Sequence, residues 1–215
     1  MTSGEFVKLI ARATGTDEAT TASYFRVARE AGLITTGARG VNAPAMTWRD
    51  AARMLIALAT VEKPSQAANA IEDFGKLQCL GEQRGQDRHL ARFRLKDLPA
   101  AHPLEDGIAG VLQLFAQKVL PAGCEIKFRL TQLNAEIRLQ GATYSYVDTE
   151  LLQSNRIRVP KNESDEEFLS RLRAEHAAET WLDRAERYST KIQVEKVIGP
   201  DVVLDVAKEF ARVEA

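Results

Sequence analysis

The chain has 215 residues, of which 45% are apolar, so it is long enough and hydrophobic enough to bury a core. Its 29 basic and 30 acidic side chains give a formal net charge of −1, which excludes the strong overall positive charge of many nucleic-acid-binding proteins. Two cysteines and three histidines, all widely spaced, exclude a disulfide framework and a zinc site with the usual ligand spacing.

The distribution of charged and apolar residues along the chain indicates in which cellular compartment to expect the protein. Residues 1–98 hold 14 basic and 11 acidic side chains, and residues 99–215 hold 15 and 19, so the first part is mildly basic. The longest apolar stretch, MLIALA, is far too short to span a bilayer, and MTSGEFVKLIARATG is unlike a signal peptide. We therefore expect a cytoplasmic protein with no membrane partner.

Two helices are expected first. Ser3 can cap a helix whose apolar residues recur at helical spacing and which Gly15 ends. Thr16 or Asp17 caps a second helix, and Gly32 suits the left-handed position after it. The inward stripe of the second helix is Thr21, Phe25 and Ala28. The mainly outward residues are Thr20, Ser23, Tyr24, Arg26 and Arg29.

The next segment, TTGARGVNAPAMT, is typical of a hairpin with a flexible tip that carries Arg39 and Asn42. After it, Thr47 and Asp50 have the spacing of a capping box and open a third helix through about Thr60. This helix is apolar on nearly every side. We expect it to be buried, either in its own domain or against a second chain.

A fourth helix is expected from Ser65 to about Leu77, started by Pro64. The polar, glycine-containing stretch CLGEQRG follows it and indicates a domain boundary. We therefore expect one domain over residues 1–80 and a second over residues 86–215.

The second half alternates between strand and helix patterns. HLARFRL alternates like a strand, and HPLEDGIAGVLQLFAQKVL has helical spacing. CEIKFRL, AEIRLQ and TYSYVD predict an antiparallel sheet covered on one side. A strand at RIRVP, a charged helix through about Tyr188 and a last helix over residues 201–213 complete the expectation of an α+β fold.

The run FVKLIARATGTDEATTASYFRVAREAGLI and the basic tip GARG resemble the helix-turn-helix and wing of winged-helix transcription regulators, with a looser similarity to phage and prophage regulators. The resemblance covers about the first sixty residues. It implies a DNA-reading second helix, although the usual helix before the pair is missing and Asp17 and Glu18 make the start of the reading helix acidic.

In such a protein, exposed side chains of the reading helix contact base edges, and other donors hold phosphates. Here Thr20, Ser23, Tyr24 and Arg26 are candidates for the bases, and Arg29 and Arg39 for the backbone, with Asn42 on the same hairpin. The alternative is a helical hairpin whose polar face is merely solvated.

Other candidate groups have ordinary structural explanations. The basic cluster Arg84, Arg88, Arg92, Arg94 and Lys96 could touch DNA, but such a run is more often a solvated strand face. Tyr144 and Tyr146 could stack on bases, but packing is favoured. We find no catalytic motif among the scattered histidines or at Glu105 and Asp106, and so expect no enzyme and no cofactor.

The predicted function is sequence-specific binding of double-stranded DNA at an operator by a homodimer, because one reading helix covers only a few base pairs. The second domain would dimerise, bind a partner protein or sense a ligand. Two alternatives stay open: an oligomeric DNA-packaging or partition adaptor, and an interaction module that inhibits a host protein without binding DNA.

Overall fold

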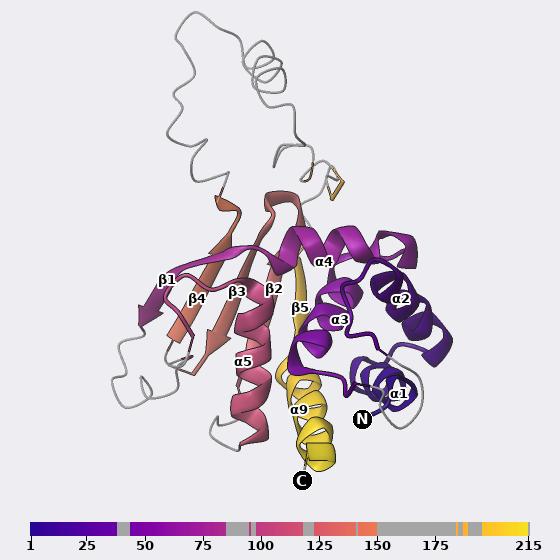
Figure 1. Cartoon of the computed structure of the whole chain (residues 1–215). Coiled ribbons are helices and arrows are strands. Elements are labelled where there is room, and N and C mark those ends of the chain that lie inside the picture. Colours follow the sequence, from indigo (N-terminus) through magenta and orange to yellow (C-terminus); the bar gives the residue numbers. More distant parts are fainter. Residues whose placement is uncertain are drawn as a thin grey trace, which may run out of the picture.

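The computed structural model combines helices with an antiparallel sheet, which is an α+β architecture (Figure 1). It describes residues 1–37, 44–84, 95, 98–117, 123–140, 142–149, 184, 187–188 and 195–214. The predicted strand HLARFRL, except for Leu95, and the predicted strand RIRVP lie outside the described residues, as does most of the charged helix before Tyr188.

The first third of the chain is helical, as the apolar spacing predicts. Its elements are α1 (Ser3–Thr14), α2 (Glu18–Glu30), α3 (Trp48–Thr60), the 3₁₀ turn η1 (Pro64–Gln66) and α4 (Ala67–Gly75). The cap of α1 is Thr2 rather than the predicted Ser3, because Thr2 and Glu5 form a reciprocal capping box. The predicted capping box of Thr47 and Asp50 at the start of α3 is confirmed.

The end of α2 is confirmed at the level of single hydrogen bonds. Gly32 has a φ of 72°, the left-handed conformation that glycine adopts without a Cβ penalty. The Leu33 N–H donates to the Ala28 carbonyl at 2.9 Å, and the Gly32 N–H donates to the Arg29 carbonyl at 3.0 Å. These two bonds form the Schellman motif that ends a helix and turns the chain.

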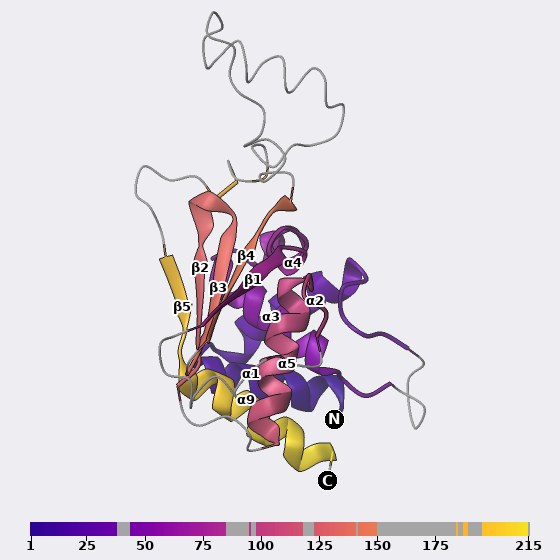
Figure 2. The same ribbon diagram turned by 90° about the vertical axis from the view of Figure 1, so that its left-hand side faces the viewer.

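The sheet follows the order β1-β4-β3-β2-β5. Its strands are β1 (Gln78–Arg84), β2 (Glu125–Arg129), β3 (Asn134–Leu139), β4 (Ala142–Val147) and β5 (Glu195–Ile198). All neighbouring strands are antiparallel. The described helices lie on one side of the sheet (Figure 2), which confirms the prediction of a sheet covered on one face.

Two strands, β1 and β5, were not predicted from the sequence. In β1, Gly81 has a φ of 147° beside a register shift against β4, so a β-bulge carries the glycine that made the stretch resemble a loop. The predicted boundary therefore coincides with a strand of the sheet. Independent folding of residues 1–80 and 86–215 stays a prediction, although buried residues from both ranges form one continuous core.

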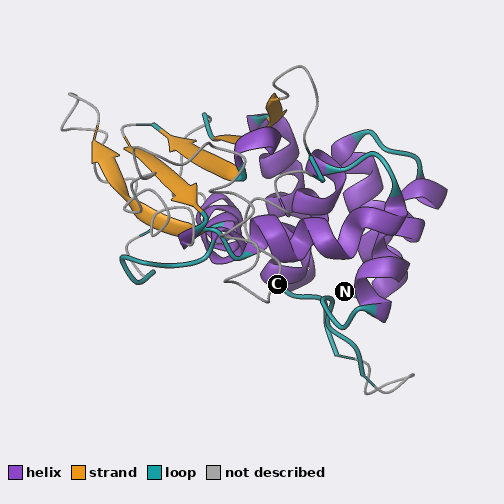
Figure 3. Ribbon diagram, turned by 90° about the horizontal axis from the view of Figure 1, so that it is seen from above, coloured by secondary structure: helices purple, strands orange, loops and turns teal. Residues whose placement is uncertain are grey.

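Two further helices, α5 (Leu104–Ala116) and α9 (Pro200–Glu214), were both predicted and join the two halves. The Phe210 ring of α9 lies 4.5 Å from the Trp48 ring and 6.0 Å from the Phe6 ring, measured between centroids. The last helix of the chain thus packs against the first and third helices. In Figure 3 the sheet lies on one side of the molecule and the helical layers on the other.

The third helix is buried inside the chain itself. Met54, Ile56 and Ala57 have no exposed surface, and α2, α4, α5 and β5 all pack against α3. The sequence left open whether α3 is buried within the chain or against a second chain, and the structure shows that it is buried within the chain. Ile56 is therefore not available to a second chain.

Candidate nucleic-acid interface

Helices α1 and α2 form a compact pair on the side of the molecule away from the sheet (Figure 1). Gly15, with a φ of 69°, ends α1, and two residues later Asp17 caps α2 by accepting the Thr20 N–H at 2.9 Å. Hydrogen bonds from the side chain and the backbone of Thr20 lower the pKa of the Asp17 carboxyl. The Phe6 and Phe25 rings, 5.8 Å apart, fix the helices against each other. A short, rigid turn thus sets the angle of α2.

The outer face of α2 changes in character along its length. Ala19 and Ala22 are exposed near its start, Ser23 is half-buried, and Arg26 is exposed one turn later. Small side chains let a helix backbone approach a groove, and the methyl group of alanine can contact that of thymine. Arg26, one turn beyond these alanines, has a longer side chain that reaches further into a groove. A helix face of this kind is one that a DNA major groove can admit.

The candidate residues on the outer side of α2 differ in their exposure and in the contacts that their side chains already make. Thr20 is half-buried, and the Ser23 hydroxyl donates to the Ala19 carbonyl at 3.0 Å. Arg29 is exposed, and its guanidinium lies 5.8 Å from the centroid of the Phe25 ring. Thr20, Ser23, Arg26 and Arg29 therefore share the accessible side of α2.

Tyr24 was predicted to point outward, and this is wrong. Only 3% of Tyr24 is exposed, and its hydroxyl donates to the Val61 carbonyl at 2.8 Å, just beyond α3. Burial, together with the nearby Glu62 carboxylate, raises the pKa of the Tyr24 phenol. A tyrosine can bury its ring and still satisfy its hydroxyl, so its place at the edge of the apolar stripe did not settle its direction.

The segment predicted to form a hairpin follows α2, and its tip lies outside the described residues. Arg39 and Asn42 lie outside the described residues, and the described residues on either side, 33–37 and 44–47, contain no strand. These two limbs extend together away from the helices (Figure 2). At their base the Thr35 N–H donates to Asp50 Oδ1 at 2.9 Å, and a Cβ on Gly37 would lie 2.5 Å from Pro44 Cδ. The limbs meet closely, which requires glycine at position 37.

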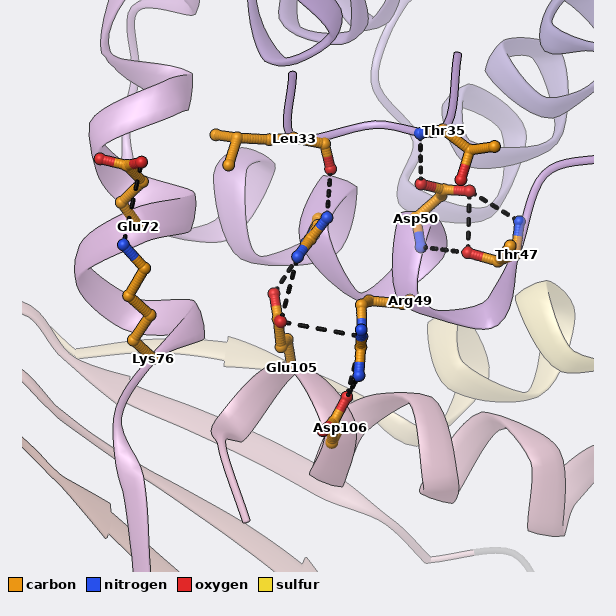
Figure 4. Close-up of polar contacts among 10 residues, drawn as sticks. Leu33, Thr35, Thr47, Arg49, Asp50, Glu72, Lys76, Glu105 and Asp106 are labelled. Atoms are coloured by element: carbon orange, nitrogen blue, oxygen red, sulfur yellow. Dashed lines mark hydrogen bonds and ion pairs between the residues drawn. The ribbon is translucent and has the colours of Figure 1, made fainter. Parts of the chain in front are cut away.

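Two arginines on α3 bind the start of α5, as Figure 4 shows for Arg49, and Arg53 also binds the turn after α2. Arg53 Nε donates to Glu105 Oε2 at 2.7 Å, and its Nη1 donates to the Leu33 carbonyl at 2.6 Å. Arg49 Nε donates to Asp106 Oδ1 at 2.9 Å, which contributes to raising the pKa of Arg49. The start of α5 thus holds α3 and the turn that follows α2.

The sequence predicted no catalytic motif at Glu105 and Asp106, and neither Arg49 nor Arg53 was a candidate. The four-residue spacing of the two arginines places them on one side of α3, and this is the only signal that the sequence contained. Their partners lie 52 and 57 residues away, so local patterns could not pair them.

The remaining candidates are structural. His102 is 3% exposed, with Nδ1 2.7 Å from the Pro99 carbonyl and Nε2 2.7 Å from the Tyr146 hydroxyl. A carbonyl only accepts, so in the neutral ring Nδ1 carries the proton and Nε2 accepts from Tyr146. Tyr144 and Tyr146 are buried, as favoured from the sequence. In the basic cluster, the side chains of Arg84, Arg88, Arg92, Arg94 and Lys96 lie outside the described residues.

Comparison of the chain with protein-family models, curated proteins and solved structures found no match. Within the described residues, no helix has the length and apolar character to cross a bilayer. The same residues contain no group of three or more histidine, cysteine, aspartate or glutamate side chains arranged to hold a metal ion.

Proposed function

We propose that the protein binds double-stranded DNA in a sequence-specific manner through the α1–α2 pair, as a transcription regulator. The observation that carries this proposal is the free outer face of α2: small residues first, then Arg26, on a helix whose opposite face is fixed by α1, α3 and α4. A rigid helix presents its side chains to base edges without an ordering cost at each encounter.

In this proposal Arg26 contacts a base edge, Thr20 and Ser23 lie beside it, and Arg29 contacts the DNA backbone. Arg39 and Asn42 are included on their sequence alone, as parts of a wing. Tyr24 is excluded because its hydroxyl is already used inside the fold. The contacts of Arg53 support the proposal, since this arginine joins Leu33, in the turn after α2, to Glu105 of α5.

The protein would act as a homodimer, because two recognition helices roughly one DNA turn apart supply the specificity that a single helix lacks. Met54, Ile56 and Ala57 of α3 have no exposed surface, so these residues cannot provide the dimer contact. Solution mass tests this part. A dimer supports the regulator, whereas a ring of many subunits would favour the DNA-packaging adaptor.

Selection of bound fragments from genomic DNA, followed by variants measured on the selected site, tests DNA binding itself. Arg26→Ala should weaken specific binding by about 1–3 kcal/mol and relax the preference at one or two base positions. Arg212→Ala, at an exposed arginine near the end of α9, is the matched control and should leave affinity unchanged. Failure of the wild-type chain to select any sequence would refute sequence-specific binding.

A further inference from the structure

A cleft of about 600 Å³ lies between α2, the end of α3, η1 and the β5 edge of the sheet. Thr16 and Thr20 line it on the α2 side, Lys63 and Gln66 on the η1 side, and Lys196 on the β5 side. The cleft thus brings residues from both halves of the chain to the flank of the proposed DNA-reading helix.

Lys196 occupies an unusual position in the sheet. It is paired in register with Phe128, which has no exposed surface, whereas the preceding Glu195 lies on the open face and pairs with Lys127 and Arg129. Strand alternation therefore places Lys196 on the side that faces the helices. The other residues of β2, β3, β4 and β5 on that side are buried and apolar or aromatic: Ile126, Phe128, Ala135, Ile137, Leu139, Ala142, Tyr144, Tyr146 and Ile198.

Lys196 and Lys63 are exposed, and neither forms an ion pair with any residue that the structure describes. The other charged groups of the cleft are Glu62 and Arg187, and Arg187 donates to Asp73 at 3.0 Å. With that arginine neutralised by its partner, the described lining of the cleft holds two ammonium groups that no described residue pairs, and one carboxylate. The cleft therefore carries an excess of positive charge.

The neutral side chains of the cleft include a hydrogen-bond donor, the side-chain amide of Gln66. The Thr16 hydroxyl is already used, because the Thr14 hydroxyl donates its single proton to the Ile10 carbonyl at 2.8 Å and therefore accepts from Thr16 at 3.1 Å. Thr20 belongs both to this wall and to the accessible side of α2, so the cleft is continuous with the proposed base-reading face. Lysine and glutamine are among the side chains that bind phosphate oxygens of DNA.

We propose that this cleft binds the phosphate backbone of the DNA strand that flanks the groove read by α2, with Lys63 and Lys196 as the two charged contacts. The inference rests on the proposed DNA binding and extends it: the sheet-bearing half of the chain contributes directly to the DNA interface. Phosphate contacts position a protein on DNA and carry no sequence information.

The test is the salt dependence of DNA binding, measured on one selected fragment and on unrelated fragments, for the full-length double variant Lys63→Gln with Lys196→Gln. Loss of two phosphate contacts should lower the slope of log affinity against log salt by about 1.8, equally on all fragments. The matched control is Lys76→Gln with Lys208→Gln, which removes the same charge from two exposed sites, one just after α4 and one on α9, and should change the slope much less.

The outcomes separate this inference from the function on which it rests. A wild-type chain that binds no DNA overturns both. Specific wild-type binding with equal slopes in the cleft variant and the control overturns the cleft contact alone. If that variant keeps its DNA slope but loses binding of inorganic pyrophosphate, measured by calorimetry, the cleft is a site for small anions and the DNA assignment is wrong. Circular dichroism verifies that both double variants are folded.

Discussion

The substitution Tyr24→Phe tests whether this side chain serves the fold or the DNA. It removes one hydroxyl and leaves the ring, so packing of the ring between α2 and the end of α3 is retained. The hydroxyl donates to the Val61 carbonyl at 2.8 Å, from a residue that is only 3% exposed. Tyr24 and Val61 also line the cleft, so water can reach this bond from that side only.

A typical hydrogen bond contributes about 0.5–1.5 kcal/mol, and leaving a buried acceptor unpaired costs about 1–3 kcal/mol. We therefore expect Tyr24→Phe to lower the free energy of unfolding by about 1.5 kcal/mol. For a chain of this length, this corresponds to a fall of about 3–6 °C in Tm. Differential scanning calorimetry with parallel urea titration measures both quantities.

Ser23→Ala is the matched control, because it removes a neighbouring hydroxyl that bonds only to its own helix. Its effect on unfolding should stay within about 0.5 kcal/mol. Below the transition temperature, Tyr24→Phe should bind DNA as the wild type does. An unchanged Tm together with a tenfold loss of DNA affinity would show that Tyr24 contacts DNA and would refute the structural role.

Three further predictions concern the core. Ile56→Glu places a carboxylate at a fully buried site and should abolish the cooperative thermal transition; a folded monomer by circular dichroism and solution mass would contradict the intradomain position of α3. Gly107→Ala would put a Cβ 2.9 Å from Tyr146 Cζ, so denaturant titration should show a loss of about 1–3 kcal/mol despite better helix propensity, and unchanged or increased stability would refute the close approach. Burial raises the pKa values of Tyr24 and Tyr146, so the neutral phenols are favoured in the fold. The stability that they contribute is complete below their usual pKa of about 10 and is lost as pH rises through the raised values. Absorbance titration should therefore show fewer than four tyrosines ionising before alkaline unfolding, and ionisation of all four with unchanged circular dichroism would disagree.

Local signals in the sequence determined most of the elements. The 3.6-residue spacing of apolar side chains predicted α1, α2, α3, α5 and α9, and alternation predicted β2, β3 and β4. The glycine at position 32 and the capping box at Thr47 and Asp50 fixed two helix ends, because each needs only neighbours within a few residues. The candidates Thr20, Ser23, Arg26 and Arg29 also followed from the position of each residue around one helix.

Only the tertiary structure decided features that depend on distant partners. Tyr24 turned inward because the Val61 carbonyl, 37 residues away, accepts from its hydroxyl. Arg49 and Arg53 of α3 bond to Asp106 and Glu105, which lie more than fifty residues away in the sequence. The segment β1 is a strand because it pairs with β4 around a bulge. Lys196 joined the flank of α2 because sheet pairing fixed the register of a short edge strand. Each of these interactions needs a second group whose position local periodicity does not encode.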